Sequence, residues 1–294
     1  MSNFVQQQHS ICSFSNEDSW VILSPIEQSI KRKIESVGTP LKDWDIQIYR
    51  GVLTGYNDAF IIPTEKRDEI LANCITEEER QKTAELIRPI LRGRDIKRYG
   101  YDWANLWLIN THNGVKGVMP RVDIMEYPAL KAHLDQHWDK ISKRADKGDT
   151  PYNLRNCAYL EDFDKPKVMW KIIGCNINFS YDEGAVICNN AVNIMTGCRE
   201  NLIQFVGLMN SKLFDWYLKL TTEAEVQGGG IQLYVTTLEK TLVKLDFPST
   251  LSDVINKRIN NMANDVDVDY AIFNSYNLTE EEIQYILSCK QVDR

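Results

Sequence analysis

The chain has 294 residues and a formal net charge of -7, with 43% hydrophobic and 26% charged residues. This composition is typical of globular proteins, and the length allows one large or two modest domains with a sizeable core. No apolar run approaches the roughly 18 residues of a membrane span, and the first ten residues lack a basic flank followed by an apolar stretch. We therefore expect a cytoplasmic protein that does not contact a membrane.

The cysteines and the charge distribution narrow the possibilities. None of the seven cysteines forms a C-x-x-C pair, which argues against a zinc ribbon and favours reduced thiols. Residues 265–294 contain seven acids and two bases, so this tail contributes -5 of the net charge. By contrast, Arg88–Arg98 contains five bases and one acid. Because salt screens distant charges, such a basic segment can still face phosphates.

The first half of the chain alternates helical and extended patterns. Residues 1–19 are polar and are expected to be a flexible lead-in. A capping box at Ser24–Glu27 predicts a helix that ends at Gly38. Strands are expected at 45–50 and 59–62, as a hairpin or as strand–loop–strand around the glycine-bounded turn 50–57. Further elements are expected in this order: a helix over 76–87, a strand at 106–109 and a helix over 127–145.

The second half continues this alternation and ends in helices. Strands are expected at 167–173, 176–181, 185–188 and 231–235, and helices over 200–220 and from 249 onward. The whole pattern predicts an α+β fold with a mixed or mainly antiparallel sheet and packed helices. We expect a main domain over 20–248, followed by a helical segment over 249–294.

Several catalytic motifs are missing from the sequence. No proline is followed by another proline, so the N/D-P-P-aromatic loop that holds the target amine in amino-methyltransferases is absent. No G-x-G-x-x-G loop and no Walker A sequence is present. We therefore expect no catalytic residue and no cofactor site in this chain.

Two weak signals for other chemistry remain. The triplet Asp95-Ile96-Lys97 has the D-x-K pattern of nucleases but no upstream acid in the usual Pro-Asp form. His133 and His137 lie four residues apart on an expected helix, but Leu134 follows where H-E-x-x-H requires glutamate. Solvated histidines are the favoured interpretation, so we expect no metal site.

Two basic segments have the chemistry of DNA contacts. In the first, Arg92, Arg94, Lys97 and Arg98 are candidates for phosphate contacts, because guanidinium forks match phosphate oxygens. In the second, Lys143, Arg144, Tyr152, Asn153 and Arg155 are candidates for base or groove contacts. Thr54, Gly55, Asn57 and Tyr234 lie near glycines and are candidates for positions close to DNA or to a target base. A salt-bridged surface loop, a linker and tight turns are the alternative interpretations of these three groups.

An ordered set of motifs resembles a known family. It includes Ile48-Tyr-Arg-Gly-Val-Leu-Thr-Gly-Tyr-Asn, Arg88-Pro-x-Leu-Arg-Gly-Arg-Asp-Ile-Lys-Arg-Tyr, Pro151-Tyr-x-Leu-Arg-x-Cys-Ala-Tyr and Lys165-Pro-Lys-Val-Met-Trp. Shorter matches begin at Trp20 and end near Cys289, and they include Leu233-Tyr234 after the triple glycine. The set resembles the segment that follows the catalytic domain in TaqI-like adenine methyltransferases and type IIG restriction–modification enzymes.

The resemblance implies a DNA target-recognition domain with a curved sheet, like those of type I specificity subunits. It implies double-stranded DNA and a methyltransferase catalytic domain, in the same or another chain, as partners. S-adenosylmethionine would bind that catalytic domain, and this chain would be part of a larger enzyme. Two alternatives stay open: a nuclease that uses Asp95 and Lys97, and a protein-interaction module that uses the acidic C-terminal helices.

Overall fold

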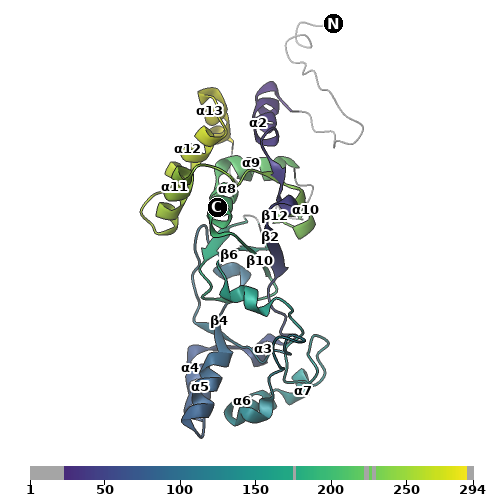
Figure 1. Cartoon of the computed structure of the whole chain (residues 1–294). Helices are drawn as coiled ribbons and strands as arrows, with labels where there is room; N and C mark the ends of the chain where they lie inside the picture. Colours follow the sequence, from purple (N-terminus) through teal and green to yellow (C-terminus); the bar gives the residue numbers. More distant parts are fainter. Residues whose placement is uncertain (1–22, 175–176, 222–224, 227–229, 290–294) are drawn as a thin grey trace. The chain divides into compact units, whose positions relative to one another are not determined.

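The computed structural model describes residues 23–174, 177–221, 225–226 and 230–289 (Figure 1). The expected lead-in 1–19 lies outside the described residues. The chain folds as two compact units. The sheet unit contains residues 45–206 and 225–226 with 230–234, and the helical unit contains 23–44, 207–221 and 235–289. This division differs from the expected boundary at 248, because segments far apart in the sequence pack with the C-terminal helices.

The helical unit is built mainly from amphipathic helices. Its elements are α2 Pro25–Glu35, β1 Thr39–Pro40, η1 Leu41–Asp43, α9 Lys212–Thr221, α10 Val235–Lys240, β13 Leu242–Val243, α11 Ser249–Ile259, α12 Asp265–Ser275 and α13 Glu280–Ser288. The predicted capping boxes begin α2 and α13: Ser24 accepts from the backbone of Glu27, and Thr279 accepts from that of Glu282. β1 and β13 pair antiparallel.

One carboxylate joins the first and last helices of this unit. Glu282 accepts hydrogen bonds from Ser29 Oγ at 2.7 Å and from Lys33 Nζ at 2.6 Å. The hydroxyl of Tyr285 donates to Glu27 at 2.6 Å. These contacts span about 250 residues of sequence and explain why α2 belongs with the C-terminal helices.

The first sheet of the sheet unit is antiparallel, with strand order β2-β10-β6-β8. Its strands are β2 Ile46–Arg50, β6 Lys167–Lys171, β8 Phe179–Asp182 and β10 Val192–Gly197. Helix α8, Arg199–Asn210, follows β10, and its Phe205 ring lies 5.6 Å from that of Phe179. The side chains of β6 and β8 are almost all buried, as expected for strands covered on both faces.

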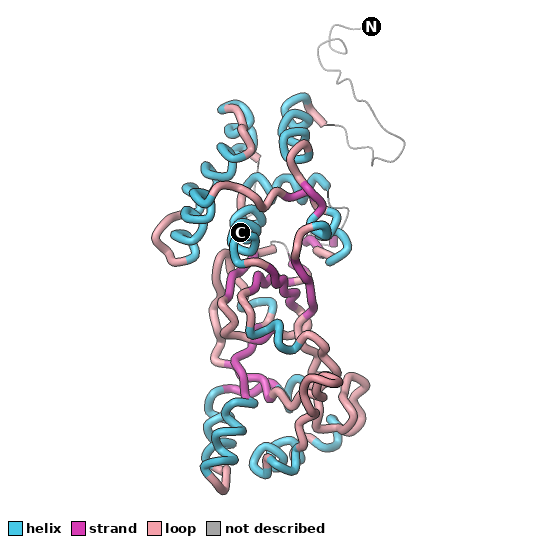
Figure 2. The backbone as a smooth tube through the Cα atoms, in the orientation of Figure 1, coloured by secondary structure: helices cyan, strands magenta, loops and turns pink. Residues whose placement is uncertain are grey.

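The second sheet is mixed, with order β3-β5-β4-β9 and a parallel β4–β9 pair. Its strands are β3 Ile61–Pro63, β4 Ile87–Leu91, β5 Leu106–Ile109 and β9 Ile187–Cys188, and its helices are α3 Asn57–Phe60, α4 Thr64–Ala72, α5 Glu77–Leu86, α6 Pro128–Asp135 and α7 Trp138–Ile141. A small third sheet joins β11 Glu225–Val226, β12 Gly230–Gln232 and β7 Ile173–Gly174. Figure 2 shows long connecting loops between these strands. The predicted α+β class with mixed sheets is confirmed.

Several expected elements differ in detail. β2 and β3 lie in different sheets, so 45–62 is strand–loop–strand rather than a hairpin. The expected helix over 200–220 is interrupted at Ser211, whose buried hydroxyl donates to Leu208 O and accepts from Phe214 N. Such local side-chain bonds replace the helical pattern. The start of the basic segment, Arg88–Leu91, lies in strand β4 rather than in a surface loop.

The core of the sheet unit contains one buried ion pair among apolar side chains. Phe60, Ile90, Leu108 and Met169 are fully buried. Lys167 and Asp182 face each other across β6 and β8 at 2.5 Å, and both are buried. Among the described residues, no helix is long and apolar enough to span a membrane.

Candidate functional site

Three loops of the sheet unit pack together, and one arginine joins two of them. We call residues 50–57, 110–122 and 144–160 the loop cluster. Arg144 is only 7% exposed and donates to the carbonyl oxygens of Thr54, Pro151 and Asn153, the last two at 3.1 and 2.5 Å. Its guanidinium also lies 4.3 Å from the ring centre of Phe60. Five donors in a rigid fork allow one arginine to join several backbone segments.

Asn153 and its neighbours hold the other two loops together. Asn153 is 1% exposed, and its Nδ2 donates to Val122 O at 2.9 Å. Leu154 N donates to Thr111 O at 2.8 Å, and Thr111 Oγ1 donates to Tyr152 O at 2.6 Å. Because buried backbone groups need partners, these bonds fix the second and third loops to each other.

These contacts correct two of the expected groove residues, Arg144 and Asn153. Arg144 and Asn153 bind backbone groups inside the protein, so their polar atoms do not face a DNA groove. Burial lowers the pKa of Arg144 to about 10. The Tyr152 hydroxyl donates to Asp135 at 2.6 Å, and its ring lies 5.4 Å from that of Trp138. Within 143–155, Arg144 and Asn153 thus hold loops together.

The first loop carries three candidates that were expected near DNA. Thr54 is buried and donates to Asn57 Oδ1 at 2.6 Å, while Asn57 is exposed at the start of α3. Gly55 has a φ of 67°, and a Cβ there would lie 2.5 Å from Asp146 O. The glycine therefore serves close backbone packing within the loop cluster. Tyr234 is 49% exposed and follows β12, in a different sheet.

Two candidates of the second segment do face solvent. Lys143 is exposed, and none of the described residues forms an ion pair with it. Arg155 is exposed as well and pairs with Asp146 at 2.9 Å. Surface pairs of this kind contribute little to stability, so Arg155 can exchange its partner for a phosphate at small cost.

The first basic segment, 92–98, also contains both a residue that is bound within the protein and residues that are exposed. Arg92 binds both oxygens of buried Asp95, at 3.0 and 2.8 Å, and its backbone N–H donates to the same carboxylate. Burial by itself would raise the pKa of Asp95, but these hydrogen bonds outweigh it and hold the pKa below its usual value. Arg92 therefore has a structural role, since a buried carboxylate engages its guanidinium.

Of the other three cations of this segment, Arg94 and Lys97 are exposed and Arg98 is partly buried. Arg94 is exposed, with no ion pair to any described residue. Lys97 is exposed and lies 3.6 Å from Asp102. The Arg98 guanidinium lies 5.8 Å from the ring centre of Tyr99. Arg94 and Lys97 keep the exposure that a phosphate contact requires.

The two weak signals for other chemistry have structural explanations. Asp95 is engaged by Arg92, and no group of three or more acidic, histidine or cysteine side chains among the described residues is placed to hold a metal. His133 is buried, with Nε2 at 3.0 Å from Ala59 O, rather than solvated as expected. The geometry gives no support to a nuclease centre at Asp95 and Lys97.

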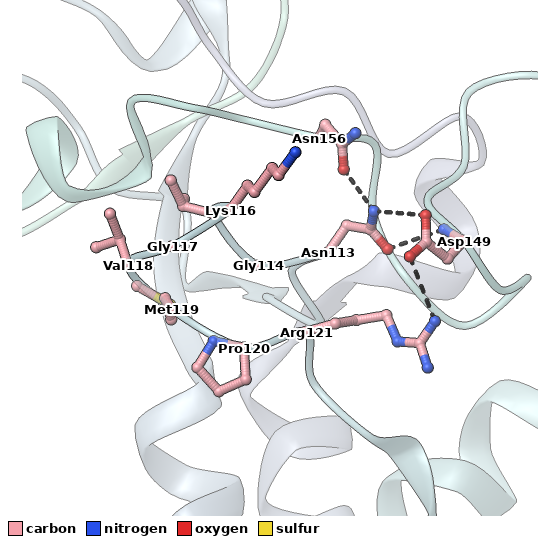
Figure 3. A pocket seen from close by; sticks show the side chains of 11 residues that line it. Asn113, Gly114, Lys116, Gly117, Val118, Met119, Pro120, Arg121, Asp149 and Asn156 are labelled. Atoms are coloured by element: carbon pink, nitrogen blue, oxygen red, sulfur yellow. Dashed lines mark hydrogen bonds and ion pairs between the residues drawn. The ribbon is translucent and has the colours of Figure 1, made fainter.

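The sequence interpretation missed a hollow that is lined by residues of the loop cluster. Figure 3 shows the tight loop 113–121, with Asn113 between Asp149 and Asn156. Asn113 Nδ2 donates to both side chains, at 3.0 and 2.5 Å, and Asp149 N donates to Asn113 Oδ1 at 2.8 Å. The hollow has a volume of about 610 Å³, and Lys116 on its wall is exposed, with no ion pair to a described residue.

A second cavity, of about 310 Å³, lies within the loop cluster. Its wall includes Arg50, Asn110, His112 and Asn156. The sequence interpretation proposed none of these four residues. The available signal was the turn sequence His112-Asn-Gly with Gly117, because asparagine and glycine favour tight loops next to a strand end.

Comparisons with known proteins agree with this fold. Residues 88–241 match the TaqI-like C-terminal specificity domain. No curated protein matches the chain. The structure is similar to that of the type IIL restriction–modification enzyme MmeI in complex with DNA, with a TM-score of 0.54, 13% identity, and coverage of 84% of this chain and 36% of that chain.

A second similar structure is that of the type IIG restriction endonuclease BpuSI. Its TM-score is 0.54 and its identity 15%, and the match covers 88% of this chain and 32% of that chain. The chain thus spans about a third of the length of either enzyme. The match to the specificity domain covers more than half of the 294 residues. The chain therefore belongs to the family of TaqI-like C-terminal specificity domains.

Proposed function

We propose that this chain is the DNA target-recognition module of an adenine-specific restriction–modification enzyme and that it carries no catalytic machinery of its own. Its family supplies specificity, and one of its structural relatives was solved in complex with DNA. The methyl transfer, and the S-adenosylmethionine it uses, would belong to a methyltransferase catalytic domain in the same or another chain. This assignment agrees with the absence of an N-P-P-aromatic loop here.

One observation in the sheet unit carries the proposal. Despite the net charge of -7, several exposed cations have no acidic partner among the described residues. They are Arg50, Arg94, Lys116, Lys140, Lys143 and Lys147. Ion pairs neutralise most other cations of this unit, for example Lys66 with Glu69 at 2.5 Å and Lys82 with Glu78 at 3.0 Å. Unpaired cations are available for phosphates, whose contacts fix the register of a protein on DNA.

The test is a titration of the whole chain into fluorescent duplex DNA at several salt concentrations. We expect weak binding whose logarithm falls linearly with that of the salt concentration. Lys143→Gln with Lys147→Gln should lower the slope by up to about two units, because each lost phosphate contact removes about one. The matched control, Lys66→Gln with Lys82→Gln, removes the same charge from residues with acidic partners and should change the slope much less.

Two outcomes would contradict the proposal. A chain with no salt-dependent affinity for duplex DNA would favour the protein-interaction alternative. Equal effects of the two double variants would show that only total charge matters. Calorimetry with S-adenosylmethionine completes the test, and saturable micromolar binding by this chain would overturn the assignment of the cofactor to another domain.

A further inference from the structure

The 310 Å³ cavity of the loop cluster contains a buried amide with an unused hydrogen-bonding atom. Asn110 follows strand β5, lines the cavity and is 7% exposed. Its Oδ1 is buried and accepts no hydrogen bond from any described residue. A buried acceptor that is left unsatisfied destabilises the folded chain. The oxygen is shielded from solvent, so a donor from outside the chain reaches it when the amide turns toward the cavity.

His112 lines the same cavity. Its Nδ1 accepts a hydrogen bond from Gly114 N at 3.2 Å, so the ring proton lies on Nε2. Burial lowers the pKa of His112, which keeps the ring neutral near pH 7. Asn110 and His112 together offer an acceptor and a donor for the edge of a heterocycle.

The charge and the apolar lining of the cavity indicate which chemical class of ligand it can bind. No carboxylate lines the cavity, whereas Arg50 and Arg155 both do. Arg50 donates through Nε to Asn190 O at 2.9 Å and has no acidic partner among the described residues. Val52, Leu53 and Leu154 form an apolar part of the wall. A flat apolar ring with an adjoining negative charge fits this combination.

We infer that this cavity binds an unpaired, amino-substituted nucleobase, adenine in the first place, with its adjoining phosphate on Arg50. The amide of asparagine pairs with adenine because its oxygen accepts from the exocyclic amine and its nitrogen donates to a ring nitrogen. A cavity of about 300 Å³ is at the small end of known ligand sites, which suits a single nucleotide. The nucleotide comes either from DNA, as a base outside the helix, or from solution. Only the first source rests on the proposed function.

The test measures binding of dAMP and of duplexes to the whole chain and to Asn110→Leu. Leucine has nearly the shape of asparagine, so this variant removes the amide without opening a cavity. We expect dAMP to bind the wild-type chain and to bind Asn110→Leu about tenfold or more weakly, since a good bidentate pair discriminates at that level. dTMP and deoxyribose 5-phosphate should bind more weakly than dAMP. Asn73→Leu, at an exposed amide away from the cavity, is the control and should bind normally.

Stability distinguishes a ligand-binding role from a structural one. Asn110→Leu should melt at the same or a higher temperature than the wild-type chain, because it replaces an unsatisfied polar group with an apolar one. A lower melting temperature together with unchanged dAMP affinity would overturn the inference. The wild-type chain should bind dAMP more tightly than deoxyadenosine, and Arg50→Gln should remove this difference in affinity. An unchanged difference would contradict the phosphate contact.

The two sources of the nucleotide give different results. If the base comes from DNA, a duplex with one unpaired adenine should bind more tightly than a fully paired duplex, and Asn110→Leu should abolish the difference. If it comes from solution, dAMP should bind while the two duplexes behave alike. If neither dAMP nor the unpaired adenine depends on Asn110, the inference is wrong, even where salt-dependent duplex binding upholds the proposed function.

Discussion

The guanidinium of Arg144 lies over the ring of Phe60, with 4.3 Å to the ring centre, and joins backbone carbonyls of two separate loops. The segment 143–155, whose basic residues predicted DNA contacts, therefore contains a residue that holds the loop cluster together. Its exposed neighbour Lys143 makes no such contacts. Buried and exposed cations therefore stand next to each other in this segment.

We expect Arg144→Met to lower the free energy of unfolding by about 3 kcal/mol, because the carbonyls of Thr54, Pro151 and Asn153 lose a shared donor. Arg144→Lys should recover little of the lost free energy of unfolding, since one ammonium group cannot reach all three carbonyl oxygens. Urea unfolding measures both variants. Lys143→Met is the control and should stay within about 0.5 kcal/mol of wild type. Equal stability of the Arg144 and Lys143 variants would contradict this role.

Arg92 and Arg94 should separate stability from binding. Arg92→Ala should destabilise the chain by about 2 kcal/mol at neutral pH, because buried Asp95 loses its two side-chain donors. The folded-state pKa of Asp95 is lowered, so this stabilisation exists above the usual carboxyl pKa and is lost as pH falls through the lowered value. The difference between wild type and Arg92→Ala should therefore shrink in acid.

Arg94→Ala should leave stability unchanged and reduce the salt dependence of duplex binding by about one unit. Urea unfolding at several pH values and binding titrations check both variants. If Arg92→Ala instead weakens DNA binding with no loss of stability, the structural assignment of Arg92 is wrong.

Gly55→Ala should destabilise the loop cluster by about 1–3 kcal/mol, since φ is 67° and the new Cβ would lie 2.5 Å from Asp146 O. Gly100→Ala is the matched control, because a Cβ there meets nothing within 4 Å. Thermal unfolding compares the two variants. Similar melting temperatures would show that the first loop moves away from Asp146 at little cost.

Stability should fall between pH 7 and pH 5.5, because burial lowers the pKa values of His112 and His133 in the folded chain. The unfolded chain binds these protons more readily, so stability is complete above the usual histidine pKa and is lost as pH falls toward the lowered values. His133→Gln, which keeps a donor for Ala59 O, should reduce this pH dependence. Urea unfolding between these pH values measures the free energy of unfolding of both chains. If this free energy changes with pH equally in His133→Gln and in the wild type, His133 does not cause the pH dependence.

The sequence by itself determined the local elements with strong signals. The capping boxes at Ser24 and Thr279 begin helices where expected, and the apolar run at Leu106–Ile109 forms a strand whose second half is buried. These features depend on neighbouring residues, so a pattern of a few positions is sufficient. The ordered motifs also identified the family, which residues 88–241 confirm.

Only the tertiary structure decided which polar residues face solvent. Arg92 and Arg94 are two residues apart and chemically identical, yet among the described residues a carboxylate binds the first and none binds the second. Asn110 gave no signal in the sequence, because its importance comes from a cavity whose walls are supplied by three separate loops. Burial and pairing depend on contacts between distant segments, and no local pattern specifies them.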